Sequence, residues 1–476
     1  MRARYFYGWN VVGATSVMAL FSFGLGFYGL SVYVAMLQRL HGWSAATVSA
    51  PVTVYYLAGA LLTASIGDLY GRFGPRAVVG GGALAMAAGL AMLGVVTRPW
   101  QLYPVFLVMS LGWGAMSGAA INIILAPWFE RRRGLAVSLG FNGATLGGVI
   151  VAPGLIPLID RVGFAFALAI AALVLLVVLV ALAACVMRRG PEELGGGPDG
   201  DPLPSRRLDS SPGVGVSRRG DALRTWRFWS VSVPFALALA AQVGVLTHLV
   251  ALVTPTLGTG GAARAISATT AAALGGRLVT GLVVDRLNRR LVTSATLVVQ
   301  MLGLALLTRT TSTALVYAGC CLFGLGVGNL TSLPGLILAV EWSRARFSGL
   351  VALVVGINQF TFAFGPSLVG VLHDWRDYGW ALGACMTLQA MAAVLVMLGP
   401  GRGRPGDNPR SPLGLTRSGV PSVEADPCPG PVEDLHDRRQ LALRKDAAGA
   451  GKNIVACRAH RGYLASISFR PRRAKS

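Results

Sequence analysis

Charged residues are scarce in this chain, and lysine is missing from most of it. Only 13% of the 476 residues are charged, whereas a soluble chain of this length carries about a quarter. The three lysines all follow residue 400: Lys445, Lys452 and Lys475. Residues 1–400 therefore have no nucleotide-binding loop with a phosphate-binding lysine, which disfavours ATP-driven transport. A composition of 54% hydrophobic residues with a mean hydropathy of +0.60 indicates a polytopic membrane protein.

Metal-ligand and catalytic patterns are missing as well. The six cysteines have no metal-ligand spacing, and the four in apolar segments are expected as small buried hydrophobes: Cys185, Cys320, Cys321 and Cys385, with Cys428 and Cys457 in the tail. No His/Asp/Glu cluster falls within an apolar run, which disfavours a membrane enzyme. We predict no catalytic residue, no metal and no cofactor. Gly24-Leu25-Gly26-Phe27-Tyr28-Gly29 matches a dinucleotide-binding pattern, but no strand precedes it, so close helix packing is the better interpretation.

The formal net charge of +22 would indicate a nucleic-acid partner in a soluble protein. Here the arginines fall between apolar runs and in the tail, so membrane topology explains them and no nucleic acid is predicted. The tail, residues 401–476, is rich in Pro, Gly and Arg and is predicted to be disordered. It is either a cytoplasmic extension or the product of an altered reading frame. Its basic residues can contact anionic membrane lipid.

A basic signature occurs twice and relates two halves of the chain. Residues 67–76 recur as residues 281–290, at an offset of 214, and Trp128 and Trp342 share that offset. Two landmarks with one offset indicate duplicated halves, as in secondary transporters that bind a substrate between them. The predicted fold class is therefore an all-α membrane protein, with twelve transmembrane helices in two pseudo-symmetric six-helix bundles.

Twelve apolar spans can be drawn along the chain. They cover residues 10–35, 46–67, 77–97, 101–126, 135–158, 164–187, 229–256, 265–284, 291–308, 313–339, 348–372 and 380–399. A polar stretch between the sixth and seventh is too poor in apolar residues to fold alone. We predict an N-terminal bundle over 1–187, a cytoplasmic central loop over 188–227, a C-terminal bundle over 228–400 and the tail over 401–476.

Arginine is divided unevenly between alternate loops. The side of Arg2 and Arg4 holds twelve arginines and the opposite side six. The positive-inside rule therefore places both termini in the cytoplasm. No cleavable signal is evident after Met1. Arginine-only usage with abundant Ala, Gly and Val is typical of a high-GC bacterium, and hence of its cell inner membrane.

These features resemble the major facilitator superfamily over roughly residues 5–400. The family signature Gly-x-x-x-Asp-Arg-x-Gly-Arg-Arg is matched in the second copy at Gly281, Asp285, Arg286, Arg289 and Arg290. The first copy keeps Gly67, Arg72, Gly74 and Arg76, with Gly71 at the aspartate position and Asp68 three positions earlier. The resemblance implies the twelve-helix fold and transport by alternating access. It also implies that these loops lock one side of the carrier through charge contacts with a neighbouring helix end.

Three further segments resemble the monocarboxylate-porter and oxalate/formate-antiporter-like branches. They are Tyr7-Gly8-Trp9 with Gly42-Trp43-Ser44, the segment from Trp128 to Ala136, and Gly365-Pro366-Ser367-Leu368-Val369-Gly370 followed by Asp374. In anion-carrying relatives an arginine of helix 8 contacts the carboxylate, and Arg277 aligns with it. Two positions depart from these branches. Ala273 replaces the porters' aspartate, and Asn358 and Gln359 stand in the region of the oxalate-type lysine.

Arg277 is the leading candidate for substrate binding. It lies about two helical turns, roughly 12 Å, before Asp285 and Arg286. An arginine at that depth needs a wet cavity or a counterion, and its planar fork can take both oxygens of a carboxylate. The alternative is a structural arginine, satisfied by helix-end carbonyls or snorkelling toward the cytoplasm.

Other polar side chains within the spans complete the candidate site. His248 can carry a proton near neutral pH, although a membrane histidine more often forms hydrogen bonds between helices. Asn358 and Gln359 are predicted to shape the pocket together with Asn142 and Tyr28. For Tyr28, helix packing is the alternative.

The predicted function is secondary active transport of a small organic anion by a monomer. The anion is expected to be a monocarboxylate, moved by proton symport or anion exchange. An exporter of hydrophobic compounds on the same fold is a first alternative, since the spans carry so little charge. A non-transporting membrane sensor, signalling through the central loop, is a second.

Overall fold

Helices form all the regular structure in the part of the chain that the computed structural model describes. That part comprises residues 6–187, 190–191, 193, 197–200, 223–284, 286–308, 312–342 and 344–399, without the side chains of residues 200, 344–349 and 352. Asp285, most of the predicted central loop and the whole predicted tail lie outside it.

The element order follows the predicted spans closely. Before the central loop the elements are α1 (Gly8–Phe23), η1 (Gly24–Tyr28), α2 (Gly29–His41), α3 (Ala45–Leu93), η2 (Pro99–Gln101), α4 (Leu102–Ala115), α5 (Gly118–Leu125), α6 (Arg133–Leu146), η3 (Gly147–Val151), α7 (Ala152–Val162) and α8 (Phe164–Cys185). After it they are η5 (Pro198–Gly200), α10 (Trp226–Val283), α11 (Arg289–Thr308), α12 (Thr313–Val327), α13 (Leu333–Glu341), α14 (Arg344–Phe362), α15 (Gly365–Trp375) and α16 (Tyr378–Met397).

Nine helical stretches among the described residues are long and apolar enough to cross a membrane. The number is below twelve because α3 and α10 each cover two predicted spans, and the predicted span 313–339 is divided between α12 and α13. Within α3 and α10 the chain leaves helical geometry at Gly74 (φ 74°) and Gly258 (φ 68°), values that favour glycine. One expectation is corrected here. Gly67, Asp68 and Arg72 lie in α3 and not in a loop.

Polar side chains cap the helices at one end of the molecule. The Ser44 hydroxyl accepts the backbone N–H of Thr47 at the start of α3 (3.2 Å), and Asp377 accepts that of Trp380 at the start of α16 (3.0 Å). Both satisfy N–H groups that a helix leaves without partners. Gly42 ends α2 with a φ of 66°. Because these loops are short and polar, the helix ends there lie within a few residues of the ends of the predicted spans.

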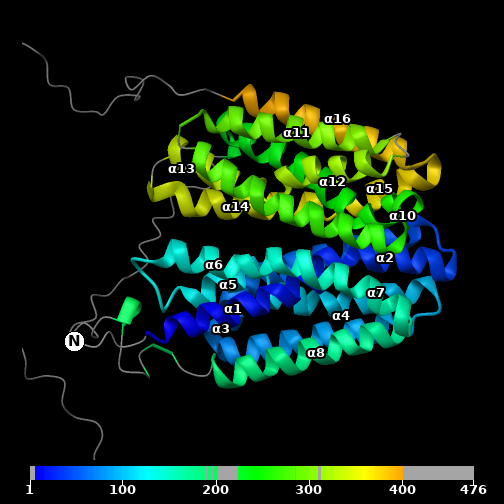
Figure 1. Cartoon of the computed structure of the whole chain (residues 1–476). Coiled ribbons are helices and arrows are strands. Elements are labelled where there is room, and N and C mark those ends of the chain that lie inside the picture. The colour runs from blue at the N-terminus through cyan, green and yellow to red at the C-terminus, as the bar shows by residue number, and fades with distance from the viewer. Residues whose placement is uncertain are drawn as a thin grey trace, which may run out of the picture. The chain divides into compact units, whose positions relative to one another are not determined.

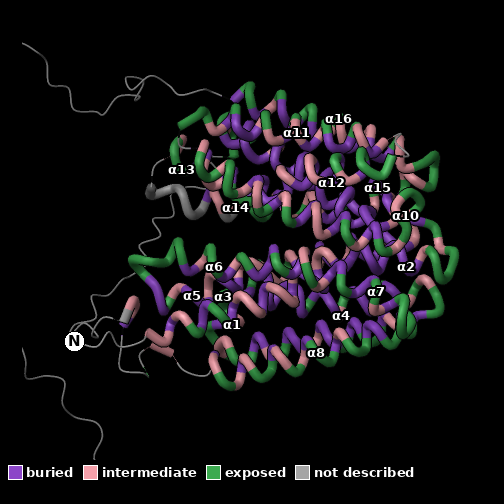
Figure 2. The backbone as a smooth tube through the Cα atoms, viewed as in Figure 1, coloured by how far each residue is buried: buried purple, intermediate pink, exposed green. Residues whose placement is uncertain are grey.

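Helices before and after the central loop pack mainly within their own group (Figure 1). In the first group α3 packs on α4 and α8, and α1 on α6; in the second, α11 packs on α12 and α16. Contacts between the groups run from α10 to α2 and α7 and from α14 and α15 to α3. Helix α10 is the most buried of the candidate spans, with 83% of its most apolar window inside the structure. Figure 2 shows buried residues along most of it.

Glycines allow several of these helices to touch backbone to backbone. A methyl group at Gly143 of α6 would overlap the carbonyl oxygen of Ser16 in α1, and one at Gly324 of α12 would overlap that of Thr269 in α10. The predicted small-residue packing is thus present. Cys320 and Cys385 are buried as expected, whereas Cys185 is exposed.

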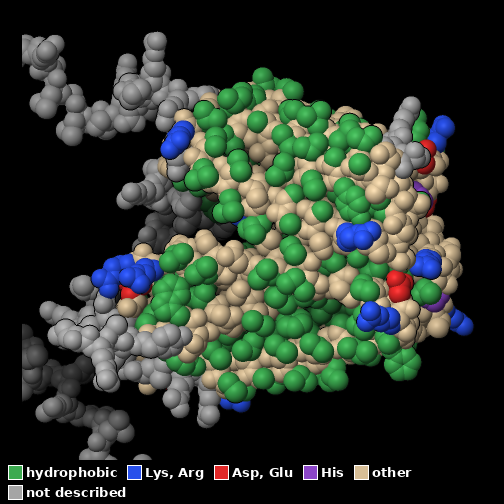
Figure 3. Space-filling model, in the orientation of Figure 1, with side chains coloured by type: hydrophobic (Ala, Val, Ile, Leu, Met, Phe, Trp, Pro, Cys, Tyr) green, Lys and Arg blue, Asp and Glu red, His purple; other side chains and the backbone are tan. Residues whose placement is uncertain are grey.

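The surface has the division expected of a membrane protein. On the face in Figure 3, hydrophobic side chains cover the middle, and arginine side chains lie mostly toward the two ends. Helix α8 is apolar all round, with a mean hydropathy of 3.2 and only 28% of its window buried. Such a helix is stable where its outer face meets lipid.

Candidate functional site

Two π-helical turns pack against each other in the first half of the chain. A Cβ placed on Gly24 of η1 would lie 3.1 Å from the carbonyl oxygen of Gly147 in η3. Within η1 the carbonyl of Gly26 accepts the Tyr55 hydroxyl (2.7 Å), and that of Leu25 accepts the Tyr33 hydroxyl (3.0 Å). Single π-turns inside helices are frequent at functional sites. The buried tyrosines hold this one in place.

Aromatic side chains gather around these turns in what we call the aromatic cluster. Its members are Phe23, Phe27, Tyr28, Tyr55, Tyr56, Trp113 and Phe362. The rings of Phe27 and Trp113 are stacked, with centroids 6.0 Å apart and planes 18° apart. Gly59 leaves room for the indole, because a Cβ there would lie 2.7 Å from Trp113. Each aromatic pair contributes about 0.5–1.5 kcal/mol beyond the area it buries.

The cluster lies where the two groups of helices meet. Phe362 at the end of α14 packs edge-on against Tyr56 of α3, with centroids 5.3 Å apart. The ring of Tyr28 lies against Gly148, and the Thr270 side chain of α10 reaches the same glycine. The Ser267 hydroxyl of α10 donates to the carbonyl of Val149 in η3 (2.9 Å). The π-turns, the aromatic rings and α10 therefore form one contact region.

Arg277 lies two turns beyond Thr270 on the same helix. Its side chain is half-buried, and its Nε donates to the carbonyl of Gly328 at 3.4 Å, where the backbone leaves α12. Asn329 beside it donates to the Leu325 carbonyl (3.1 Å), and its buried Oδ1 has no partner among the described atoms. Arg277 and Tyr28 are related through α10, because Thr270 of that helix and the Tyr28 ring reach the same glycine, Gly148.

Three other predicted substrate residues are scattered. Asn358 of α14 is 3% exposed, and its Oδ1 has no partner in the described part of the chain. It lies one turn before Phe362, at the edge of the aromatic cluster. Gln359 beside it is half-buried, and Asn142 of α6 is exposed. Their roles remain predictions.

His248 lies apart from the aromatic cluster, near the starts of α3 and α16. It is 1% exposed, and its Nε2 lies 2.9 Å from the Ser49 hydroxyl and 3.1 Å from the Pro366 carbonyl. Its Nδ1 lies 3.3 Å from the Tyr378 hydroxyl. The ring therefore joins three helices, as the alternative interpretation expected for a membrane histidine.

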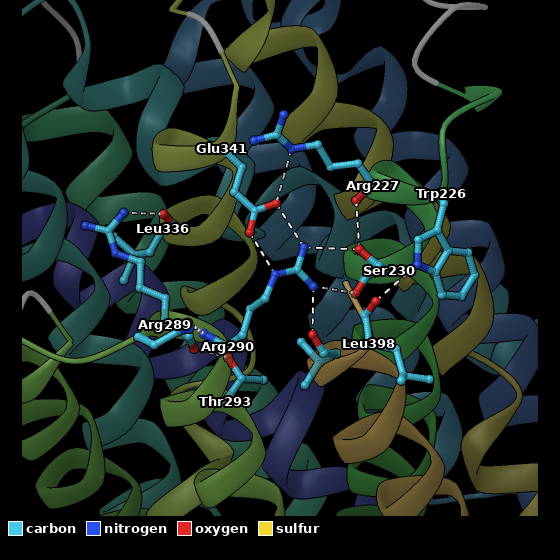
Figure 4. A network of polar contacts seen from close by, with 11 residues as sticks. Trp226, Arg227, Ser230, Arg289, Arg290, Thr293, Leu336, Glu341 and Leu398 are labelled. Carbon is cyan, nitrogen blue, oxygen red and sulfur yellow. Dashed lines mark hydrogen bonds and ion pairs between the residues drawn. The ribbon is translucent and has the colours of Figure 1, made fainter. Parts of the chain in front are cut away.

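The second basic signature forms a buried ion pair (Figure 4). Arg290 is 3% exposed and binds Glu341 at the end of α13 with two bonds, Nε to Oε1 at 2.7 Å and Nη2 to Oε2 at 2.9 Å. Its Nη1 donates to the Val396 carbonyl (2.7 Å) and its Nη2 to the Ser230 hydroxyl (3.1 Å). Arg227 adds a longer contact to Glu341 at 3.7 Å. This network ties α10, α11, α13 and α16 together.

The first signature forms no such network. Arg76, 214 residues before Arg290, is exposed, and Pro127 occupies the position that corresponds to Glu341 at the same offset.

The other residues of the two signatures are mostly exposed. Asp68 is exposed, and the described residues give it no ion pair. The Arg72 guanidinium lies 5.3 Å from the Phe73 ring centroid. Gly67, Gly281 and Arg286 are also exposed, and Asp285 lies outside the described residues. The structure therefore separates two copies that look alike in sequence.

A short turn of the central loop docks on the first half. The Asp199 carboxylate accepts the backbone N–H groups of Glu130 (3.0 Å) and Arg131 (2.7 Å). Burial opposes ionisation of Asp199, but these N–H groups and the charge of Arg131 outweigh it and hold the pKa of the carboxyl below its usual range. A cavity of about 340 Å³ beside it is lined by Phe6, Trp9, Phe129, Arg131, Arg132 and Asp199.

Several of these features were beyond sequence reasoning. The π-turns carry no signal except the glycines at Gly24 and Gly147. Glu341 could have been found only as the single carboxylate near the Trp342 landmark. Asp374, which belongs to one of the segments that resemble known branches, caps the start of α3. No local sequence pattern predicts this contact.

Comparison with known proteins agrees with this helical fold. The profile of the Major Facilitator Superfamily matches residues 16–337 and 265–446. The MFS transporter asaE of Aspergillus flavus is 29% identical over 301 residues, which are 62% of this chain and 64% of that protein. The agnestins efflux protein AgnL12 of Paecilomyces divaricatus is 27% identical over 347 residues, 70% and 73% of the two chains. The chain thus spans less than two thirds of the first of these relatives.

A solved structure shares the fold. It is a bacterial homolog of the human lysosomal transporter Spinster in an inward-facing and occupied conformation. It superposes with a TM-score of 0.63 over 83% of this chain and 96% of that one, at 14% sequence identity.

Proposed function

Since the chain belongs to the Major Facilitator Superfamily, and is thus a membrane transport protein, we propose that it exports a hydrophobic aromatic compound by alternating access. The aromatic cluster carries this proposal. It gathers seven rings at the contact between the two groups of helices, and Arg277 lies two turns along α10 from Thr270, which reaches Gly148 beside Tyr28. Such a site favours a flat apolar body with a polar or anionic group for the guanidinium.

This proposal replaces the expected monocarboxylate. A small carboxylate has no aromatic body that could pack against the rings of the aromatic cluster. The name of the Paecilomyces relative describes an efflux protein, which fits the alternative that the sequence left open. The monocarboxylate-porter branch, proton symport and the bacterial inner membrane draw no support from these relatives, which are fungal. The protein is therefore placed in a membrane without naming which one.

The finer layout is also a proposal. We take α3 and α10 as two crossings each, which restores twelve crossings in two bundles over residues 1–187 and 228–400, joined by the loop 188–227. Both termini and both basic signatures would face the cytoplasm, with the protein a monomer in contact with membrane lipid. Asp374 and Ser367 of the second bundle contact the first turns of α3, and the solved relative is inward-facing. The structure would then be closed at its non-cytoplasmic end.

Three ligands test the site by calorimetric titration of the purified protein in lipid nanodiscs. 2-Naphthoate and 2-naphthamide share a ring system and differ in charge, whereas acetate has the charge without the ring. We expect the two naphthalene compounds to bind and acetate not to. Arg277→Gln should weaken 2-naphthoate alone, and Trp113→Ala should weaken both naphthalene compounds about 2- to 10-fold.

Trp100→Ala is the matched control, because Trp100 is 62% exposed and lies outside the aromatic cluster. It should leave every affinity unchanged. Binding of acetate as tight as that of 2-naphthoate would contradict the proposal and restore the small carboxylate. Equal losses of affinity from Trp100→Ala and Trp113→Ala would show that the aromatic cluster is not part of the binding site.

A further inference from the structure

The two groups of helices are joined by polar contacts at the end where α3 begins. The Thr53 and Ser367 hydroxyls lie 2.6 Å apart across α3 and α15. A Cβ on Gly370 would lie 2.6 Å from the Ser49 hydroxyl oxygen, so the two helices touch closely. We call this region the α3–α15 junction. Its α3 residues precede the first basic signature on the same helix.

A carboxylate from one half caps a helix of the other at this junction. The two oxygens of Asp374, at the end of α15, accept the backbone N–H of Ala45 (3.0 Å) and of Ala46 (2.7 Å) at the start of α3. These are donors that a helix leaves unsatisfied, and a negative charge there is favoured by the helix dipole. Separating the halves would expose both donors and leave the carboxylate without them.

His248 of α10 completes the junction in its neutral form. The Pro366 carbonyl can only accept, so Nε2 must carry the hydrogen directed at it. The Ser49 hydroxyl donates to the Ala45 carbonyl, which leaves its oxygen to accept from the same Nε2. In a neutral ring Nδ1 is then the acceptor for the Tyr378 hydroxyl.

A second proton on His248 would not suit these partners. Nδ1 would become a donor, so the Tyr378 hydroxyl would have to accept from it and turn its own hydrogen away. The ring is 1% exposed, and no carboxylate of the described residues forms a hydrogen bond with it. A buried charge without such a partner is costly. Opening the junction would expose the His248 ring to water, so the charged imidazole would no longer be buried.

We propose that the α3–α15 junction is a proton-sensitive latch, closed while His248 is neutral and released when His248 binds a proton. The ionisable groups that face the ring are His373 and Asp374 of α15 and Tyr378 of α16; α3 presents only the Ser49 hydroxyl. This inference rests on the proposed alternating access, but it does not depend on which compound is transported. In the proposed orientation it takes its proton from the non-cytoplasmic side.

Distances between two spin labels test the latch in the full chain in nanodiscs, with its six cysteines replaced. Labels at Leu40→Cys and Trp375→Cys occupy exposed positions (55% and 66%) on opposite sides of the junction. Below about pH 6.5 an exposed imidazole binds a proton. We expect the ratio of long to short distances to rise up to about tenfold per pH unit below that value. His248→Gln should abolish this dependence, and His373→Gln should keep it.

The cap is tested at constant pH by two neighbouring aspartates. Asp374→Asn should raise the long-distance population at pH 8. Asp377→Asn removes the same charge and a helix cap within one half, and should not. If Asp374→Asn does not fold, Ala45→Pro removes one donor to Asp374 at the first position of α3, where proline is tolerated.

Two results would overturn the latch. A pH response that survives His248→Gln, or is lost in His373→Gln, assigns the proton elsewhere. Equal spin-label distances in Asp374→Asn (or Ala45→Pro) and Asp377→Asn would show that the Asp374 cap does not stabilise the closed junction. Because no compound is added, both outcomes are independent of the naphthalene titrations.

Discussion

At the scale of residues, equivalent positions in the two halves have different environments. Arg290 and Arg76 occupy the same place in the doubled signature, yet one is 3% exposed and the other exposed. Glu341 makes the difference, because a buried guanidinium needs a paired carboxylate and Pro127 cannot supply one. The second half is therefore internally tied at the end that carries the basic signatures, and the described residues of the first half form no equivalent network.

Arg290→Met is expected to destabilise the protein by on the order of 3–5 kcal/mol, because Glu341 would remain largely buried with only the longer contact to Arg227. Thermal unfolding of the purified protein in detergent measures the loss. Arg76→Met is the matched control, and a change at that exposed site should stay within about 0.5 kcal/mol. Equal midpoints for the two variants would show that the ion pair contributes nothing.

At the scale of elements, the helices depart from regularity where they carry the candidate site. Helices α1 and α2 are separated by η1, and α6 and α7 by η3, so both π-turns fall in the middle of a predicted span. Around them, α1 approaches α6 through glycine, and Tyr28 meets α10. Regular helices would not bring these groups to one place, so the irregular turns position the aromatic cluster.

Gly143→Ala tests the close contact between α1 and α6. The added methyl group would overlap the Ser16 carbonyl oxygen, so the helices must separate, at a cost of about 1–3 kcal/mol. Gly134→Ala on the same helix meets nothing within 4 Å and should leave stability unchanged or raise it by up to about 1 kcal/mol. Thermal unfolding compares the two. If both variants are as stable as the parent, the contact is looser than the structure indicates.

At the scale of the whole molecule, polar contacts are distributed unequally between the two ends. The α3–α15 junction joins the halves through Asp374, His248 and Ser367. At the other end, the network of Arg290 stays within the second half. The proposed alternating access requires closure to pass from one end to the other, and the α3–α15 junction is the end that we propose to be closed here.

Single cysteines in sealed vesicles test the orientation. Phe73→Cys and Leu287→Cys lie beside the basic signatures, and Trp100→Cys and Trp375→Cys lie at the opposite end; all four positions are at least half exposed. An impermeant maleimide should label the first pair from the cytoplasmic side alone and the second pair from the other side alone. Labelling of Phe73→Cys and Leu287→Cys from different sides would contradict the duplicated topology.

By itself, the sequence determined the family and most of the helical spans, because apolar run length and repeated spacing are local properties of the chain. The same local signals pointed to Arg277 and His248 as ionisable groups within the spans. Only the tertiary structure decided what these residues contact. It placed Arg277 at the Gly328 carbonyl, His248 in a separate junction, Arg290 against Glu341 and Asp374 on the start of α3. Each of these contacts joins segments far apart in the chain, so its energy depends on helix packing and leaves no pattern in neighbouring residues.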